Sequence, residues 1–217
     1  MNASGRTQFA PTMLIVRLLD KLEFVELNIG MEDDFMVIES ERLYMQSPHE
    51  VSSGSVRDYY VINREFLKAF SPVRDASFYT DAYQENMLTS QIDDWEAGRG
   101  YRFYISLKEE KNRIIGTISL SNVVRGAFHS CFLGYQLDEE HANQGYMTEA
   151  TRRIVDFAFQ DLQLHRIEGN IIPRNYASRA VVEKCNFTME GLSKKYLKIN
   201  GVWEDHIHYV IINEEME

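Results

Sequence analysis

Two short polar segments of this chain carry residue types that could bind a phosphate-bearing ligand. In the first, 137–150, a strand-like stretch ends, a polar loop with one glycine follows, and a helix opens at once. The first N–H groups of a helix have no internal partners and lie at the positive end of its dipole, so they attract anions. Gly145 has no Cβ and would let backbone amides approach a pyrophosphate closely. Taken alone, one glycine is more typical of an ordinary strand-to-helix turn.

The second segment, 173–178, follows the next strand-like stretch and precedes the next helix-like one. Asn175 could bind a ligand or satisfy the loop backbone, and Ser178 could donate its hydroxyl to a ligand or cap the helix. Polar groups at the ends of adjacent strands are where an open sheet holds its ligands. The two segments together therefore favour a binding site.

The elements that must position these segments are predicted from apolar periodicity and from turn residues. Strands are expected at 35–44, 101–106, 114–120, 128–137, 167–172, 196–198 and 206–211, and helices at 58–70, 81–97, 146–162 and 178–184. Asn200-Gly201 predicts a hairpin turn, because both residues tolerate a positive φ. The order predicts an α+β fold whose mixed, mostly antiparallel sheet contains one parallel crossover through the helix at 146–162.

Residues 1–33 do not share this regular pattern. We predict an N-terminal extension over 1–33 and one domain over 34–217. A start codon misassigned upstream of Met31 or Met36 would also produce such an extension.

Composition narrows the possible partners. The net charge of -10 and the pI of about 5.1 disfavour nucleic acid and favour basic protein substrates or polyamines, although an acidic surface also serves solubility. Two cysteines are too few for a disulfide framework, and no zinc-ligand spacing occurs, so we expect no metal. No apolar run approaches the roughly 18 residues of a membrane span, and we expect a cytoplasmic protein without membrane contact.

Residues 36–213 resemble the GNAT superfamily of acetyltransferases, and in particular its Rim-type branch, the ribosomal-protein N-terminal alanine acetyltransferases. The segments that carry the resemblance occur in order along the chain: 39–43 (ESERL), 115–118 (IGTI), 133–135 (LGY), 143–150 (NQGYMTEA), 165–168 (HRIE), 175–178 (NYAS) and 183–187 (EKCNF).

The resemblance implies a GNAT-like sheet, with helices on both faces, that holds acetyl-CoA as co-substrate in a V-shaped splay between two central strands. The strand at 128–137 would pair with pantetheine through Tyr135, Gln136 and Leu137. The pyrophosphate would lie on the loop and the first helical turn, and the implied residues are Asn143, Gln144, Gly145, Tyr146, Met147 and Thr148. Asn175 would bond the pantetheine arm.

Three positions depart from the superfamily pattern. Asn143 and Asn186 stand where glycine is usual, and asparagine tolerates the left-handed conformation that glycine would supply there. Val182 stands where some relatives place a tyrosine general acid, so that role must fall to another group.

The implied reaction is direct attack of an amine on the thioester, without a covalent intermediate. By the resemblance, the Ser178 hydroxyl hydrogen-bonds the cofactor sulfur. We expect Glu168 to act as general base, directly or through water; the alternative is a structural ion pair between Glu168 and Arg166 or Arg153. Cys131 has no partner base that the sequence identifies, which disfavours a cysteine nucleophile.

The sequence thus predicts an N-acetyltransferase, with the N-terminal alanine α-amine of a ribosomal or other protein as the leading acceptor. An α-amine has a pKa of about 7.7–8.0 and needs only modest help from a base. The alternatives are a small amine acceptor, such as an antibiotic, an amino sugar or a polyamine, or a non-catalytic module that senses acetyl-CoA. We expect a monomer or a homodimer.

Overall fold

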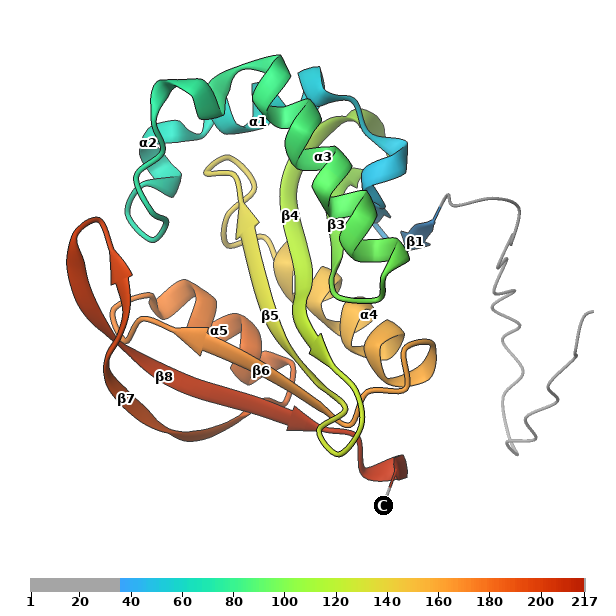
Figure 1. Cartoon of the computed structure of the whole chain (residues 1–217), viewed down its shortest axis with the longest axis vertical. Coiled ribbons are helices and arrows are strands. Elements are labelled where there is room, and N and C mark those ends of the chain that lie inside the picture. The colour runs from blue at the N-terminus through green and yellow to red at the C-terminus, as the bar shows by residue number, and fades with distance from the viewer. Residues whose placement is uncertain (1–35, 217) are drawn as a thin grey trace, which may run out of the picture. The chain divides into compact units, whose positions relative to one another are not determined.

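The computed structural model describes residues 36–216 and shows eight strands in one sheet, with five α-helices (Figure 1). In spatial order the strands are β1 (Val37–Glu39), β2 (Leu43–Gln46), β3 (Tyr101–Leu107), β4 (Glu110–Val124), β5 (Ser130–Leu137), β6 (Arg166–Ile171), β8 (Val202–Ile212) and β7 (Thr188–Ile199). The helices are α1 (Ser53–Ile62), α2 (Arg64–Leu67), α3 (Asp81–Glu96), α4 (Tyr146–Gln160) and α5 (Tyr176–Lys184). The predicted extension at 1–33 lies outside the described residues.

The strand pairing confirms the predicted mixed sheet. Every neighbouring pair is antiparallel except β5 and β6, which run parallel. A parallel pair needs a crossover connection, and α4 supplies it between β5 and β6.

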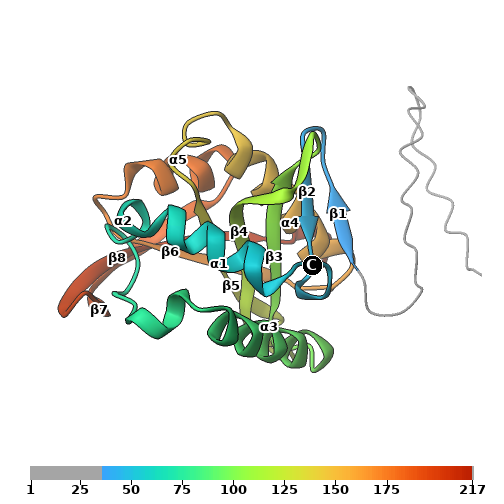
Figure 2. The same cartoon turned by 90° about the horizontal axis from the view of Figure 1, so that it is seen from above.

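Helices cover both faces of the sheet, with α1 and α3 on one side and α5 on the other (Figure 2). Strand β3 shows why both faces must be covered, because Phe103, Tyr104 and Ile105 are all fully buried. Tyr104 belongs to the apolar cluster that α1 and α3 complete. Its two neighbours point the opposite way and pack in the cluster that includes the apolar stripe of α4. That stripe includes Met147, Ala150, Ile154, Val155, Phe157 and Ala158.

The single first strand predicted over 35–44 is wrong. The chain turns between β1 and β2, where the Leu43 N–H donates to Ser40 Oγ and the Ser40 N–H donates to the Leu43 carbonyl. A serine that bonds nearby backbone offers the chain a turn in place of a continued strand.

The helix predicted over 58–70 is shifted and divided. It begins earlier, at Ser53, because Ser52 caps it by accepting a hydrogen bond from the Ser55 N–H at 3.1 Å. It ends at Ile62, where the Asn63 side-chain amide donates to the Tyr59 carbonyl at 2.9 Å. The short helix α2 then follows.

The C-terminal hairpin confirms the predicted Asn-Gly turn. Asn200 and Gly201 have φ values of 51° and 84°, and they join β7 to β8. Strand β7 is longer than predicted. The prediction missed its first part because the residues of β7 are mostly exposed and lack the apolar alternation of a half-buried strand. No helix in the described part of the chain is both long and apolar enough to span a bilayer.

Candidate active site

The central strands β5 and β6 separate soon after they meet. Their register holds Ser130 opposite Arg166, Cys131 opposite Ile167 and Phe132 opposite Glu168, and no later pair follows among residues 36–216. Figure 1 shows β5 and β6 diverging beyond this point, with α5 beside β6. The carboxyl-terminal half of β5, which includes the predicted Tyr135, Gln136 and Leu137, therefore borders an open wedge in the sheet.

The loop after β5 has the backbone that close approach to an anion requires. Gly145 is the N-cap of α4 and has a φ of 84°, in the left-handed region. Asn143 has a φ of 61°, which confirms that asparagine adopts the conformation expected at that position. Asn143, Gln144 and Gly145 are all exposed, so the amides that open α4 face accessible space.

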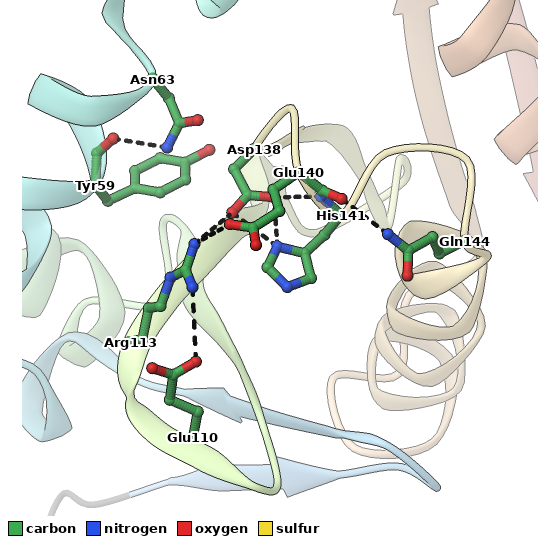
Figure 3. Close-up of polar contacts among 8 residues, drawn as sticks. All are labelled: Tyr59, Asn63, Glu110, Arg113, Asp138, Glu140, His141 and Gln144. Atoms are coloured by element: carbon green, nitrogen blue, oxygen red, sulfur yellow. Dashed lines mark hydrogen bonds and ion pairs between the residues drawn. The ribbon is translucent and has the colours of Figure 1, made fainter.

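A network of side chains braces this loop (Figure 3). The buried Asp138 carboxylate accepts hydrogen bonds from the His141 backbone N–H at 3.0 Å and from His141 Nδ1 at 2.8 Å. Arg113 of β4 donates to Glu140, and this hydrogen bond lowers the pKa of the Glu140 carboxyl. The Gln144 side-chain amide donates to the Glu140 carbonyl at 2.8 Å. The loop is therefore held in shape before any ligand arrives.

The same network contains potential metal ligands. Ligand atoms of Asp138, Glu140 and His141 lie within 4.8 Å of one another. Arg113 forms ion pairs with both carboxylates, however, and the Asp138 oxygens already accept hydrogen bonds from His141. A cation there would have to displace Arg113, so we interpret the cluster as the brace of the loop.

The first turn of α4 is tied to the β1–β2 turn, a contact that the sequence did not reveal. Glu149 accepts hydrogen bonds from Ser40 Oγ at 2.7 Å, from the Arg42 N–H at 2.8 Å and from Arg42 Nε at 2.7 Å. Burial alone would raise the pKa of Glu149, but these hydrogen bonds and the guanidinium charge hold it below its ordinary value. Arg42 also stacks on the Tyr146 ring and donates to the Gln144 carbonyl. The β1–β2 turn thus holds both the loop before α4, through Gln144, and the first turn of α4, through Glu149.

The second predicted segment lies on the far side of the wedge, at the start of α5. The N-cap is Asn175, whose side-chain oxygen accepts from the Ser178 N–H at 3.1 Å. The prediction that helix 178–184 begins at Ser178 is therefore wrong, and so is the alternative role of Ser178 as its cap. The Tyr135 hydroxyl reaches across from β5 and donates to the Ser178 carbonyl at 2.8 Å. The Ser178 hydroxyl makes no hydrogen bond with the residues that the structure describes.

Glu168 lies where the wedge opens and is held by two donors. His208 Nδ1 of β8 is 2.7 Å from one carboxylate oxygen, and Arg166 donates to the other at 3.2 Å. Burial would raise the pKa of Glu168, but the hydrogen bonds from His208 and Arg166 outweigh it and the pKa is lowered. The predicted ion pair with Arg166 exists, whereas Arg153 pairs with Asp156 instead. The sequence did not indicate a role for His208, because no local pattern links it to Glu168, forty positions earlier in the chain.

The two cysteines do not provide a nucleophile. Both are buried, and burial raises the pKa of the Cys131 thiol to about 12. A thiol that remains protonated at neutral pH is a poor nucleophile.

The segment that follows α2 contacts both β5 and the turn of the β7–β8 hairpin. The Gln136 side chain donates to Ser71 Oγ at 2.7 Å, and the Asn200 side chain at the hairpin turn donates to the Lys68 carbonyl at 3.0 Å. A cavity of about 90 Å³ beside them includes Arg64, Lys68, Arg74 and Glu65 in its lining. The local charge is therefore positive, opposite to that of the whole chain.

Comparisons with known proteins identify the family of this chain. The family model described as "Acetyltransferase (GNAT) domain" matches residues 51–188. The chain is 44% identical over 155 residues to the probable N-acetyltransferase YjcK of Bacillus subtilis, covering 71% of this chain and 85% of that protein. It is 35% identical over 170 residues to the [ribosomal protein uS5]-alanine N-acetyltransferase of Escherichia coli, covering 77% and 86%. The structure of Mycobacterium smegmatis RimJ in complex with CoA-disulfide superposes with a TM-score of 0.74 at 26% identity, covering 80% and 83%.

Proposed function

Because this chain belongs to the GNAT acetyltransferase family, we propose that it transfers the acetyl group of acetyl-CoA to the α-amine at the N-terminus of a protein, with an N-terminal alanine as the leading acceptor. The observation that carries the cofactor assignment is the left-handed Gly145 at the open end of α4, beside the wedge between β5 and β6. The chain's likeness to a [ribosomal protein uS5]-alanine N-acetyltransferase supports the acceptor.

The wedge offers a place for each part of the cofactor. The amides of residues 143–148 would bind the pyrophosphate through the positive end of α4. The unpaired edge of β5 at residues 135–137 would hydrogen-bond the amide groups of pantetheine, with Asn175 on the opposite side. The thioester would then lie close to Glu168 of β6 and Ser178 of α5, which face the wedge from the side opposite β5.

Glu168 is the proposed general base. When the neutral amine attacks the thioester carbonyl, a C–N bond forms and the C–S bond breaks, and the nitrogen must lose a proton. Glu168 would accept that proton, directly or through water, and release it to solvent. The Ser178 hydroxyl would hydrogen-bond the departing thiolate, which takes its proton from water, directly or relayed through that hydroxyl. The lowered pKa makes Glu168 a weak base. It therefore suits an α-amine, with a pKa of about 7.7–8.0, better than a lysine or polyamine nitrogen near 10.4.

A turnover assay tests the proposal. The purified protein is incubated with acetyl-CoA and one acceptor at a time, and release of free CoA is followed with a thiol reagent. The acceptors are peptides with a free N-terminal alanine, the same peptides with a blocked N-terminus and one internal lysine, and spermidine. We expect turnover with the free N-terminus alone. Turnover with spermidine alone would assign a small-amine acceptor, and binding of acetyl-CoA without any turnover would indicate a sensing module.

The role of Ser178 can be separated from helix stability, because Asn175 is the cap. We expect Ser178→Ala to lower kcat about tenfold or more with little change in the KM for acetyl-CoA, since the thiolate bears charge only as the transition state develops. Its free energy of unfolding should stay within about 0.5 kcal/mol of the parent. Asn175→Ala is the matched control and should lose about 1 kcal/mol of stability. A kcat for Ser178→Ala within about twofold of the parent would show that the departing thiolate is assisted by water or by another group instead of Ser178.

A further inference from the structure

The imidazole of His208 makes a polar contact that the proposed reaction has not yet used. His208 lies on β8 directly opposite Asn170 of β6, and its Nδ1 is 2.7 Å from Glu168 Oε1. An ionised carboxylate can only accept a hydrogen bond, so Nδ1 must carry the proton in this contact. The side chains of both residues are largely buried, with 18% and 17% exposed.

The other nitrogen of the same ring is not engaged. Nε2 of His208 is buried and has no hydrogen-bond partner among the described residues. The imidazole ring packs in a T-shaped arrangement with the ring of Tyr196 on β7, at 4.9 Å between the ring centroids. The polar contact of His208 within residues 36–216 is therefore directed at Glu168.

The groups around this pair form a clamp on the carboxylate. From β6, Arg166 donates to Glu168 Oε2, and the Asn170 side chain is a further donor that lowers the pKa of Glu168. From β7, Glu190 accepts two hydrogen bonds from the same guanidinium, from Nη1 at 2.9 Å and from Nη2 at 2.6 Å, so that Arg166 Nη2 serves both carboxylates. Each oxygen of Glu168 thus has its own donor, Arg166 from the same strand β6 and His208 from the neighbouring strand β8.

Resting on the proposed role of Glu168 as general base, we propose that His208 is a positioning residue of the transfer reaction. Its Nδ1–H fixes the rotamer of the Glu168 side chain, so that the carboxylate stays ionised and directed toward the opening of the wedge. A carboxylate that is free to rotate would reach the amine in a smaller fraction of encounters, because proton transfer needs hydrogen-bond geometry.

Three substitutions of His208 separate this role from simple packing. The side-chain amide of His208→Asn can donate from about the position of Nδ1, that of His208→Gln from about the position of Nε2, and His208→Leu cannot donate. We expect kcat to fall at least tenfold in His208→Leu and in His208→Gln, and to stay within about threefold of the parent in His208→Asn. The KM for acetyl-CoA should change little in all three. Retained activity in His208→Gln with loss in His208→Asn would overturn the proposal, because Nε2 would then be the working nitrogen.

His206 is the matched control. It lies two residues away on β8 and also packs against Tyr196, but its Nδ1 contacts the backbone carbonyl of Glu204 at 3.1 Å. His206→Asn should therefore leave the reaction of Glu168 unchanged. An equal loss of kcat in His206→Leu and His208→Leu would show that packing of the hairpin, rather than the contact with Glu168, is responsible.

A second measurement does not depend on turnover. Protein labelled with ¹³C at the glutamate carboxyls is titrated by NMR, and Glu168 is assigned by its absence in Glu168→Gln. We expect the pKa of Glu168 to rise in His208→Leu and to stay near the parent value in His208→Asn and His206→Asn. An unchanged pKa in His208→Leu overturns the clamp even if the enzyme is active. If no acceptor turns over, the proposed function fails, while the titration still decides the contact.

Discussion

Replacing Glu168 with glutamine should lower kcat by about 100- to 10,000-fold, the range that a positioned general base contributes. Glutamine keeps the shape of the side chain and can still accept a hydrogen bond from His208, but it cannot take a proton from the acceptor amine. Binding of acetyl-CoA should change little, because the loop proposed to hold the pyrophosphate follows the carboxyl end of β5, whereas Glu168 is opposite Phe132 nearer its start. Steady-state kinetics with a free N-terminal peptide, together with calorimetry for acetyl-CoA, measure the two effects separately.

Glu190 provides the control for this substitution. It shares Arg166 with Glu168, at an Nη2–Oε2 distance of 2.6 Å, but lies on the outer strand β7. If Glu168 served only as a structural partner of Arg166, Glu168→Gln and Glu190→Gln would both affect stability and leave kcat nearly intact. A kcat of Glu168→Gln within a few-fold of the parent would remove Glu168 from the mechanism.

The pH dependence of kcat/KM should follow the ionisation of the acceptor amine rather than that of Glu168. The folded-state pKa of Glu168 is lowered from an ordinary value of 4.5, so the base is already ionised throughout the neutral range. The rise in kcat/KM through pH 7 to 8 should therefore follow the α-amine of the acceptor, at about 7.7–8.0. Because Glu168 has a lower pKa in the folded than in the unfolded state, its ionisation stabilises the folded state at every pH above the unfolded-state pKa. This contribution is lost as the pH falls through the folded-state pKa.

Gly145→Val should weaken acetyl-CoA binding by about 100-fold or more. The φ of 84° is a conformation that a β-branched residue hardly adopts, so the loop must change its backbone at the N-cap of α4. If two amide–phosphate hydrogen bonds worth about 1.5 kcal/mol each are lost, the change of about 3 kcal/mol exceeds two powers of ten in Kd. Calorimetric titration of the folded variant measures the change directly.

Gly126→Val separates backbone strain from ligand contact. Gly126 has a φ of 72° in the turn between β4 and β5, and a Cβ built on it would meet nothing within 4 Å. This variant should lose stability through the same strain, by about 1–2 kcal/mol, and keep the parent affinity for acetyl-CoA. A Kd for Gly145→Val within threefold of the parent would show that the pyrophosphate binds elsewhere.

The parts of the fold that the sequence predicted are those with strong local signals. The stripe through Ala150, Ile154 and Phe157 repeats at helical spacing and packs as α4 in the core. Asn200-Gly201 forms the hairpin turn because few dipeptides accept two positive φ angles. Asn143 likewise adopts the left-handed conformation that its position requires.

The sequence failed to predict element boundaries where side chains hydrogen-bond the backbone, and contacts between residues that are far apart in the chain. Ser40 and Asn63 interrupt a strand and a helix that apolar periodicity would continue. Asn175 takes the cap that the sequence left open to Ser178, because either residue type can fill it. The contact between Glu168 and His208 depends on the register of β6 against β8, which no local pattern encodes.

The early separation of β5 and β6 leaves two edges inside the sheet. Backbone groups that a neighbouring strand would normally satisfy face the wedge from Leu133 onward. On the proposed function, the amide groups of pantetheine take the place of a missing strand, so the cofactor becomes part of the architecture as well as a reactant. The free energy of unfolding then depends on the concentration of the cofactor. At a free acetyl-CoA concentration about 100 times Kd, the folded state gains about 2.7 kcal/mol. The melting temperature should therefore climb with acetyl-CoA concentration, and a melting temperature that ignores millimolar cofactor would contradict this role of the wedge.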